Sequence, residues 1–182
     1  MVPTRPLTAA DVEAMGSAGE RMELVNGVLR EKAPVSQRHG EIEVRILSPL
    51  HVYVDGQGLG RVYPSDTQFV VLRNPDKILI PDVAFVRANR LKPETERWRM
   101  APYPPDLAVE VVSPNDRKRD LAEKLALYDQ AGVPLVWVVR PPRRAVEVRP
   151  HGQAHFTLQE TDVLDGGDVV PGFRLPVADI FR

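Results

Sequence analysis

The sequence predicts a mixed α/β fold in which a central β-sheet is flanked by helices. Helical and extended patterns alternate along the chain in the order helix, hairpin, helix, strands, helix, strands. Asn26-Gly27 stands between two alternating runs, which is the strongest short-range signal of a β-hairpin. The run 133–139 is almost continuously apolar, which is typical of a strand buried on both faces.

The N-terminal part is expected to form a short helix followed by that hairpin. Thr8 can cap a helix that ends near Gly16. The two hairpin strands are the alternating runs 21–25 and 28–32.

A longer helix is expected from about Gln37 to about Val54, with Ser36 as its N-cap. Pro49 lies inside this pattern, so either a kink or an early stop is expected there. The residues that define its apolar face by helical spacing are Ile42, Ile46, Pro49, Leu50 and Tyr53.

The remaining segments predict a series of strands and one more helix. The helix runs from about Lys118 to Ala131, after a break at 114–115, and Gly132 ends it. A polar, proline-containing insertion covers 88–105, and 74–76 forms a turn. The expected strands are 61–63, 67–72, 81–87, 106–112, 133–139, 145–149 and 154–159.

Composition bounds the class of protein. The 182 residues fit one domain, 1–182, whose core we place at about 20–150. A net charge of −1 gives no bulk attraction to nucleic acid, so local clusters must bind any such partner. The absence of cysteine excludes disulfides and thiolate chemistry. No signal peptide and no run of about 18 apolar residues is present, so a cytoplasmic protein without membrane contact is expected.

Two acidic residues are the main candidates for chemistry. Asp82 opens a strand and shares its face with Ala84 and Val86, although an acid in this place can also simply face solvent. Glu110 stands inside an apolar strand, where a carboxylate is costly unless it is paired, hydrogen-bonded or bound to metal. The alternative for Glu110 is a structural partner such as a buried arginine. Carboxylates of this kind hold hard cations, which stabilise developing charge on water or phosphate.

Lys124 is the third candidate. It lies on the flank of the sheet-facing stripe of its helix, from which its ammonium can reach the strand edge. It can equally extend to water or pair with Asp120 at i−4.

Three residues form a second tier of candidates. His39 falls on the apolar face of the first long helix, where a hydrogen-bonded core histidine is the commoner finding. Glu41 lies opposite that face and is expected to be solvated. Glu23 alternates with apolar neighbours in the first hairpin strand and can face either way.

One cluster of basic residues lies between the two acids in sequence, and another follows Glu110. Arginines neutralise phosphates and an aromatic ring can stack on a base, so these clusters suit nucleic acid, although each one also fits an ordinary arginine-rich surface. The candidates for nucleic-acid binding are Arg97, Trp98, Arg99, Arg117, Lys118 and Arg119.

Several stretches together resemble the Uma-two family, a family of small prokaryotic proteins classed as restriction-endonuclease-like within the PD-(D/E)XK nuclease superfamily. The resemblance covers roughly residues 20–150, in the order and spacing of the family. It is carried by 23–27 (ELVNG), 36–39 (SQRH), 81–85 (PDVAF), 105–114 (PDLAVEVVSP), 120–128 (DLAEKLALY), 131–134 (AGVP) and Trp137.

This resemblance implies the restriction-endonuclease-like fold, with its site at one edge of a mixed sheet. Asp82 matches the first metal-binding acid of the superfamily pattern and Glu110 the second. The pattern places lysine two residues after the second acid, where this chain has Val112. Lys124 resembles the migrated lysine of some branches, and Glu41 the acid that some members carry on their first core helix.

The resulting functional hypothesis is a Mg²⁺- or Mn²⁺-dependent endonuclease that hydrolyses phosphodiester bonds in DNA. Asp82 and Glu110 are the expected metal ligands, and Lys124 would orient or deprotonate water, or stabilise the phosphorane. The missing lysine and the slightly acidic charge favour an alternative, a nuclease-fold protein that binds nucleic acid or a protein without cutting. Hydrolysis of small phosphoesters is a third possibility. A homodimer fits cleavage of both DNA strands.

Overall fold

A six-stranded mixed sheet forms the centre of the computed structural model, which describes residues 5–113 and 117–182. Its strand order is β10-β9-β8-β7-β6-β3, with β7 and β8 parallel and the other neighbours antiparallel. The predicted mixed sheet is thereby confirmed. The strands are β3 (Gly60–Pro64), β6 (Val83–Arg87), β7 (Leu107–Val111), β8 (Leu135–Arg140), β9 (Ala145–Pro150) and β10 (Phe156–Leu158).

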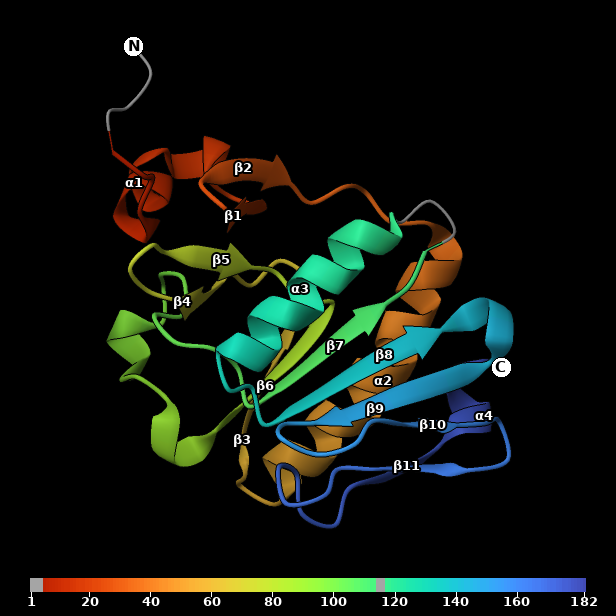
Figure 1. Cartoon of the computed structure of the whole chain (residues 1–182). Coiled ribbons are helices and arrows are strands. Elements are labelled where there is room, and N and C mark those ends of the chain that lie inside the picture. Colours follow the sequence, from red (N-terminus) through yellow and green to blue (C-terminus); the bar gives the residue numbers. More distant parts are fainter. Residues whose placement is uncertain (1–4, 114–116) are drawn as a thin grey trace.

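Two helices cover opposite faces of this sheet (Figure 1). They are α2 (Gln37–Gly56) and α3 (Lys118–Gln130). Successive side chains of a strand point to opposite faces, so Val83 packs with the α2 layer and Ala84 with the α3 layer. The same alternation buries both faces of β8, as predicted from its apolar run. The break expected at 114–115, before α3, lies outside the described residues.

Of the two effects expected at Pro49, a kink or an early stop, the early stop does not occur, because α2 continues to Gly56, close to the predicted end near Val54. Proline in a helix interior removes one hydrogen bond and costs about 3 kcal/mol. Ile46 and Leu50, on either side of Pro49, are fully buried against the sheet. Burying each such side chain is worth about 1.5–3 kcal/mol, which together offsets the cost of the proline.

The N-terminal part forms a second, four-stranded sheet with the order β2-β1-β5-β4. The predicted hairpin is confirmed, with positive φ at both Asn26 and Gly27. Thr8 and Asp11 form a capping box on the first helix. One strand of this sheet was not predicted, β5, because three residues are too few to show alternation. The elements are α1 (Ala9–Ala14), β1 (Met22–Val25), β2 (Val28–Glu31), β4 (Phe69–Leu72) and β5 (Lys77–Leu79).

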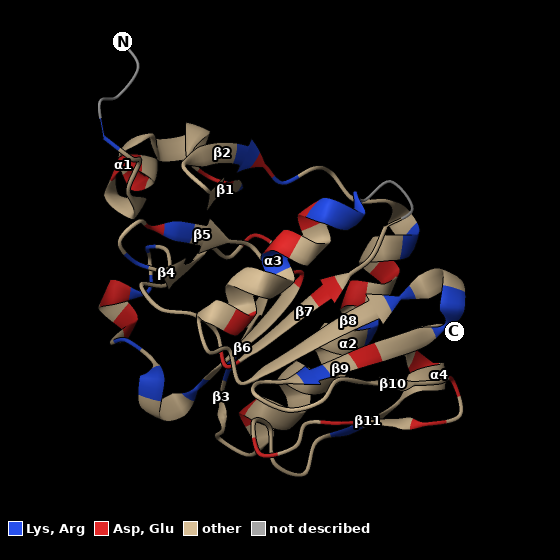
Figure 2. Cartoon of the chain, viewed as in Figure 1, with Lys and Arg blue, Asp and Glu red and all other residues tan. Residues whose placement is uncertain are grey.

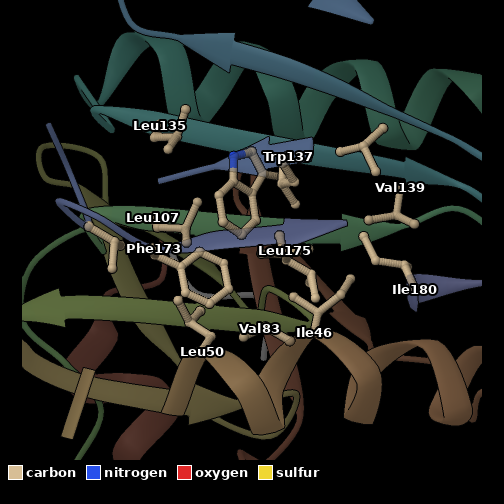
Figure 3. Packing of buried hydrophobic residues seen from close by; sticks show 14 of the residues in the cluster. Ile46, Leu50, Val83, Leu107, Leu135, Trp137, Val139, Phe173, Leu175 and Ile180 are labelled. Carbon is tan, nitrogen blue, oxygen red and sulfur yellow. The ribbon is translucent and has the colours of Figure 1, made fainter. Parts of the chain in front are cut away.

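The C-terminal segment packs beside α2 on the same face of the central sheet. Its hairpin and last helix were not predicted: β11 (Val163–Asp165), β12 (Arg174–Pro176) and α4 (Val177–Ile180). Phe173 stacks on Trp137 of β8 with ring centroids 6.1 Å apart. Figure 3 shows both rings in one hydrophobic core cluster, to which α2 contributes Leu50. Among the described residues, no helix is long and apolar enough to cross a membrane.

Short 3₁₀ helices complete the chain. Two of them lie in the predicted insertion, which contacts β4 through a bridge between Phe69 and Ala101. The four are η1 (Gly16–Ala18), η2 (Ala88–Arg90), η3 (Glu94–Glu96) and η4 (Pro141–Arg143).

Candidate functional site

The two predicted acids come together at one end of the central sheet. In the antiparallel ladder of β6 and β7, Val83 pairs with Val109, and the Asp82 N–H donates to the Val109 carbonyl at 2.9 Å. Continuing this register by one residue places Asp82 opposite Glu110. Side chains opposite each other in a ladder lie on the same face, with Cβ atoms about 4.5–5.5 Å apart. Both acids line one cavity of about 430 Å³.

Asp82 is buried and is bound through both carboxylate oxygens. Its Oδ1 accepts a hydrogen bond from Lys32 Nζ at 2.8 Å. Its Oδ2 accepts one from the Val111 N–H at 2.6 Å and lies 3.3 Å from His39 Nε2. Burial raises the pKa of Asp82, but the hydrogen bond with His39 and the charge of Lys32 outweigh burial and hold it well below its usual range. Asp82 is therefore an anion at every physiological pH.

Glu110 has a different environment, on the side of the site nearest α3. The Tyr128 hydroxyl donates to Glu110 Oε1 at 2.6 Å, and Lys124 Nζ lies 3.3 Å from Oε2. Burial raises the pKa of Glu110 to about 7, although the charge of Lys124 acts in the opposite direction. The carboxyl group is thus poised to exchange a proton near neutral pH.

Lys124 lies between two carboxylates instead of extending to water or pairing with Asp120. Its Nζ is 2.8 Å from Glu23 Oε1 and 3.3 Å from Glu110. Burial lowers the pKa of Lys124, but the charges of Glu110 and Glu23 outweigh it and raise the pKa above its usual range. Glu23, whose facing the sequence left open, points inward and also accepts the Ile80 N–H at 2.9 Å.

His39 is buried on the apolar face of α2, as expected, and it also faces the cavity. Its Nε2 lies 3.1 Å from Glu43 and its Nδ1 lies 2.8 Å from the Ser113 hydroxyl. Burial lowers the pKa of His39, but hydrogen bonds with Asp82 and Glu43 outweigh burial and raise it to about 9.

The structure does not bring every candidate to this cavity. Glu41 is exposed, pairs with Arg38 at 2.9 Å and does not line the cavity. The cluster Arg97-Trp98-Arg99 follows η3 in the insertion (Figure 1, left). The insertion joins the end of β6 to the start of β7, which are the strand ends away from Asp82 and Glu110. Of the second basic cluster, Arg117 lines the cavity, whereas Lys118 and Arg119 are exposed at the start of α3, among the basic residues drawn blue in Figure 2.

Sequence reasoning did not assign three side chains to the site: Lys32 contacts Asp82, Tyr128 contacts Glu110, and Glu43 contacts His39. The i,i+4 spacing of His39 and Glu43 places both on one face of a helix and was the signal that could have identified Glu43. Tyr128 is an aromatic residue at helical spacing from Leu121 and Leu125, a pattern that indicates a core position and not a site. Lys32 had no local signal, because only the tertiary position of the hairpin brings it to Asp82.

Comparison with known proteins then identifies the family. A family model described as "Uma2: Putative restriction endonuclease" matches residues 9–178. The chain belongs to the Uma2 family. A solved structure described as a putative nuclease belonging to DUF820 from Anabaena variabilis ATCC 29413 is similar, with a TM-score of 0.80 and 17% identity over 97% of this chain and 98% of that one. At this identity the likeness establishes the restriction-endonuclease-like fold. No curated protein matches the chain.

The site of this Uma2 protein has the donor atoms that a divalent cation needs. Of the charged side chains that line the cavity, six are acidic and four are lysine or arginine, and His39, with its pKa raised to about 9, adds a further positive charge, so the case for a cation rests on the donor atoms and not on net charge. Within the described residues, one donor atom each of His39, Glu43 and Asp82 lie within 4.8 Å of one another. Carboxylate oxygens suit Mg²⁺ and Mn²⁺, and imidazole nitrogen suits Mn²⁺ better than Mg²⁺. The residues present therefore fit a divalent metal ion.

Proposed function

We propose that the protein is a Mg²⁺- or Mn²⁺-dependent endonuclease that hydrolyses phosphodiester bonds in DNA. One observation carries this proposal: Asp82, which directly precedes β6 and bonds to the Val109 carbonyl, and Glu110 of β7 line one cavity, with the Lys124 ammonium beside Glu110. The Uma2 family assignment supports nuclease chemistry in general.

In this proposal Asp82 and Glu110 would hold the metal ion, which when bound would supply a positive charge for the scissile phosphate and a lowered pKa for the attacking water. Lys124 remains protonated between its two carboxylates, because their charges raise its pKa. Of the roles open to it, stabilising negative charge on the phosphorane is therefore favoured over accepting a proton from water. Tyr128 positions Glu110 through its short hydrogen bond.

Nicking of supercoiled plasmid DNA in Mg²⁺ or Mn²⁺ tests this proposal. We expect Asp82→Ala and Glu110→Ala each to abolish nicking while circular dichroism shows a folded chain. Glu41→Ala is the matched control, since Glu41 is an exposed acid outside the cavity and its loss should leave the rate unchanged. Full activity in either cavity variant would remove the proposal.

A second candidate function, binding of nucleic acid or a protein without cleavage, is favoured by the closed contacts of Asp82. Both of its oxygens already have hydrogen-bond donors in the protein. Calorimetry with Mn²⁺ separates the two candidates. If the protein is the proposed nuclease, Mn²⁺ should release or absorb heat on binding, and this heat should disappear in Asp82→Asn. A protein that only binds a partner can show no heat of Mn²⁺ binding.

We also propose a homodimer, because cleavage of both strands of a duplex needs two sites. Light scattering coupled to size-exclusion chromatography should give twice the mass of the chain, and a monomer mass at assay concentration would contradict this.

A further inference from the structure

His39 and Glu43 lie on one helix, and one donor atom of each lies within 4.8 Å of a carboxylate oxygen of Asp82. They lie four residues apart in the first two turns of α2, so their side chains share a face. His39 Nε2 is 3.1 Å from Glu43 Oε1 and 3.3 Å from Asp82 Oδ2. All three side chains are largely buried, with 6%, 14% and 5% of their surface exposed. A polar group buried this far requires a partner.

Neighbouring groups hold this arrangement in place. The Ser113 hydroxyl lies 2.8 Å from His39 Nδ1, which orients the ring and turns Nε2 toward the two carboxylates. Metal-binding histidines use their second nitrogen in this way to set tautomer and orientation. The Val111 N–H and Lys32 anchor Asp82 independently of His39.

Glu110 belongs to the other side of the site. Its oxygens contact Tyr128 and Lys124, both on α3, and Glu110 is not among the described residues whose donor atoms converge with His39. Asp82 is the residue shared by the two groups, because its N–H bonds to the Val109 carbonyl of β7 and its carboxylate contacts His39 of α2.

We propose that His39, Glu43 and Asp82 form a second cation position, distinct from the one at Asp82 and Glu110, that selects Mn²⁺ over Mg²⁺. Imidazole suits borderline transition-metal ions, whereas Mg²⁺ prefers oxygen ligands and retains its waters. The inference rests on the proposed function for the neighbouring position at Glu110, but binding at His39 does not require the protein to cleave DNA.

The same distances also fit an imidazolium that bridges two carboxylates with no metal. The two arrangements differ in one observable, direct coordination of the imidazole nitrogen to a cation. Pulsed electron paramagnetic resonance on Mn²⁺ detects that nitrogen through its coupling to the unpaired electrons, and calorimetry counts the ions.

The experiment titrates the full chain with MnCl₂ in the absence of DNA. We expect two Mn²⁺ per chain and a histidine nitrogen coupling that persists in excess MgCl₂. Glu110→Gln should remove one ion and keep the coupling, whereas Glu43→Gln should weaken the nitrogen-coupled ion at least tenfold. Glu41→Gln, two residues earlier on the exposed face of α2, is the matched control and should change neither quantity.

Three results would overturn the inference: a single Mn²⁺ without nitrogen coupling, Mn²⁺ binding unchanged by Glu43→Gln, or no binding at all. Thermal melts establish that each variant is folded, and Glu43→Gln serves as the decisive variant if His39→Gln unfolds the chain. Two bound ions in a protein that never nicks DNA would remove the proposed function alone. If the protein nicks DNA in a Glu110-dependent way but its bound Mn²⁺ shows no coupling to a histidine nitrogen, only this inference would be removed.

Discussion

Replacing Lys124 with methionine is expected to destabilise the metal-free protein by about 3 kcal/mol. The Lys124 ammonium contacts Glu23 and Glu110, whose side chains are only 10% and 8% exposed. Methionine keeps the apolar stem but leaves both carboxylates unpaired, and removing one partner of a buried ion pair costs about 3–5 kcal/mol. We expect the lower end of this range, because burial raises the pKa of Glu110 and the charge of Lys124 lowers it, so that loss of Lys124 raises the pKa further and proton uptake relieves part of the cost.

This loss should lower the melting temperature by roughly 6–12 °C, since each kcal/mol is worth about 2–4 °C in a chain of this length. The measurement is urea unfolding followed by circular dichroism at pH 8 in EDTA. Lys118→Met is the matched control, because Lys118 is exposed in the first turn of the same helix, and its loss should stay within about 0.5 kcal/mol. A cost below about 1 kcal/mol for Lys124→Met would refute the buried-pair argument.

Three further changes test the hydrogen bonding, the core and the acid stability. Tyr128→Phe should cost about 2 kcal/mol in urea unfolding, because it removes a buried hydrogen bond to the carboxylate of Glu110. Leu50→Ala should cost about 2–5 kcal/mol in the same assay, because the fully buried side chain leaves a cavity under the sheet. Partial burial raises the pKa of Glu147, but hydrogen bonds from two arginines outweigh it and hold the pKa below its usual range. Glu147 should therefore contribute about 0.5–1 kcal/mol to the free energy of unfolding at pH 7, and this contribution should be lost as the pH falls below about 4.5.

Each of these predictions has a contradicting result. Unchanged stability in Tyr128→Phe would mean that Glu110 does not depend on the hydroxyl. The control for Leu50→Ala is Val52→Ala on the exposed face of α2, and equal losses in the two variants would contradict the core assignment. If the difference in the free energy of unfolding between wild type and Glu147→Gln were as large at pH 3 as at pH 7, the predicted loss of stability at low pH would be contradicted.

Elements with a strong local pattern could be predicted from the sequence. The hairpin at Asn26-Gly27 forms because both turn residues tolerate positive φ, which is a property of the turn itself. Helices α2 and α3 follow from spacing of about 3.6 residues. β5 could not be recognised, because its three residues are held by partners in β1 and β4 and not by their own pattern.

The effect of Pro49 also depended on tertiary structure. Local chemistry predicts a kink or a stop, and the early stop does not occur, because Ile46 and Leu50 bury their side chains on both sides of the proline. A packing energy of this kind depends on a sheet whose strands come from elsewhere in the chain, so no local pattern contains it.

The amino-acid sequence by itself determined that Glu110 stands on one strand, that Asp82 stands at the start of another, one residue before β6 begins, and that Lys124 lies on the following helix. Alternation and helical spacing act over a few residues, so they could be read directly. Only the tertiary structure decided that Lys32 and His39 close on Asp82, that Glu23 shares Lys124 with Glu110, and that the Arg97–Arg99 cluster lies at the far end of the strands. These contacts join segments that are distant along the chain, and strand pairing and helix docking bring them together.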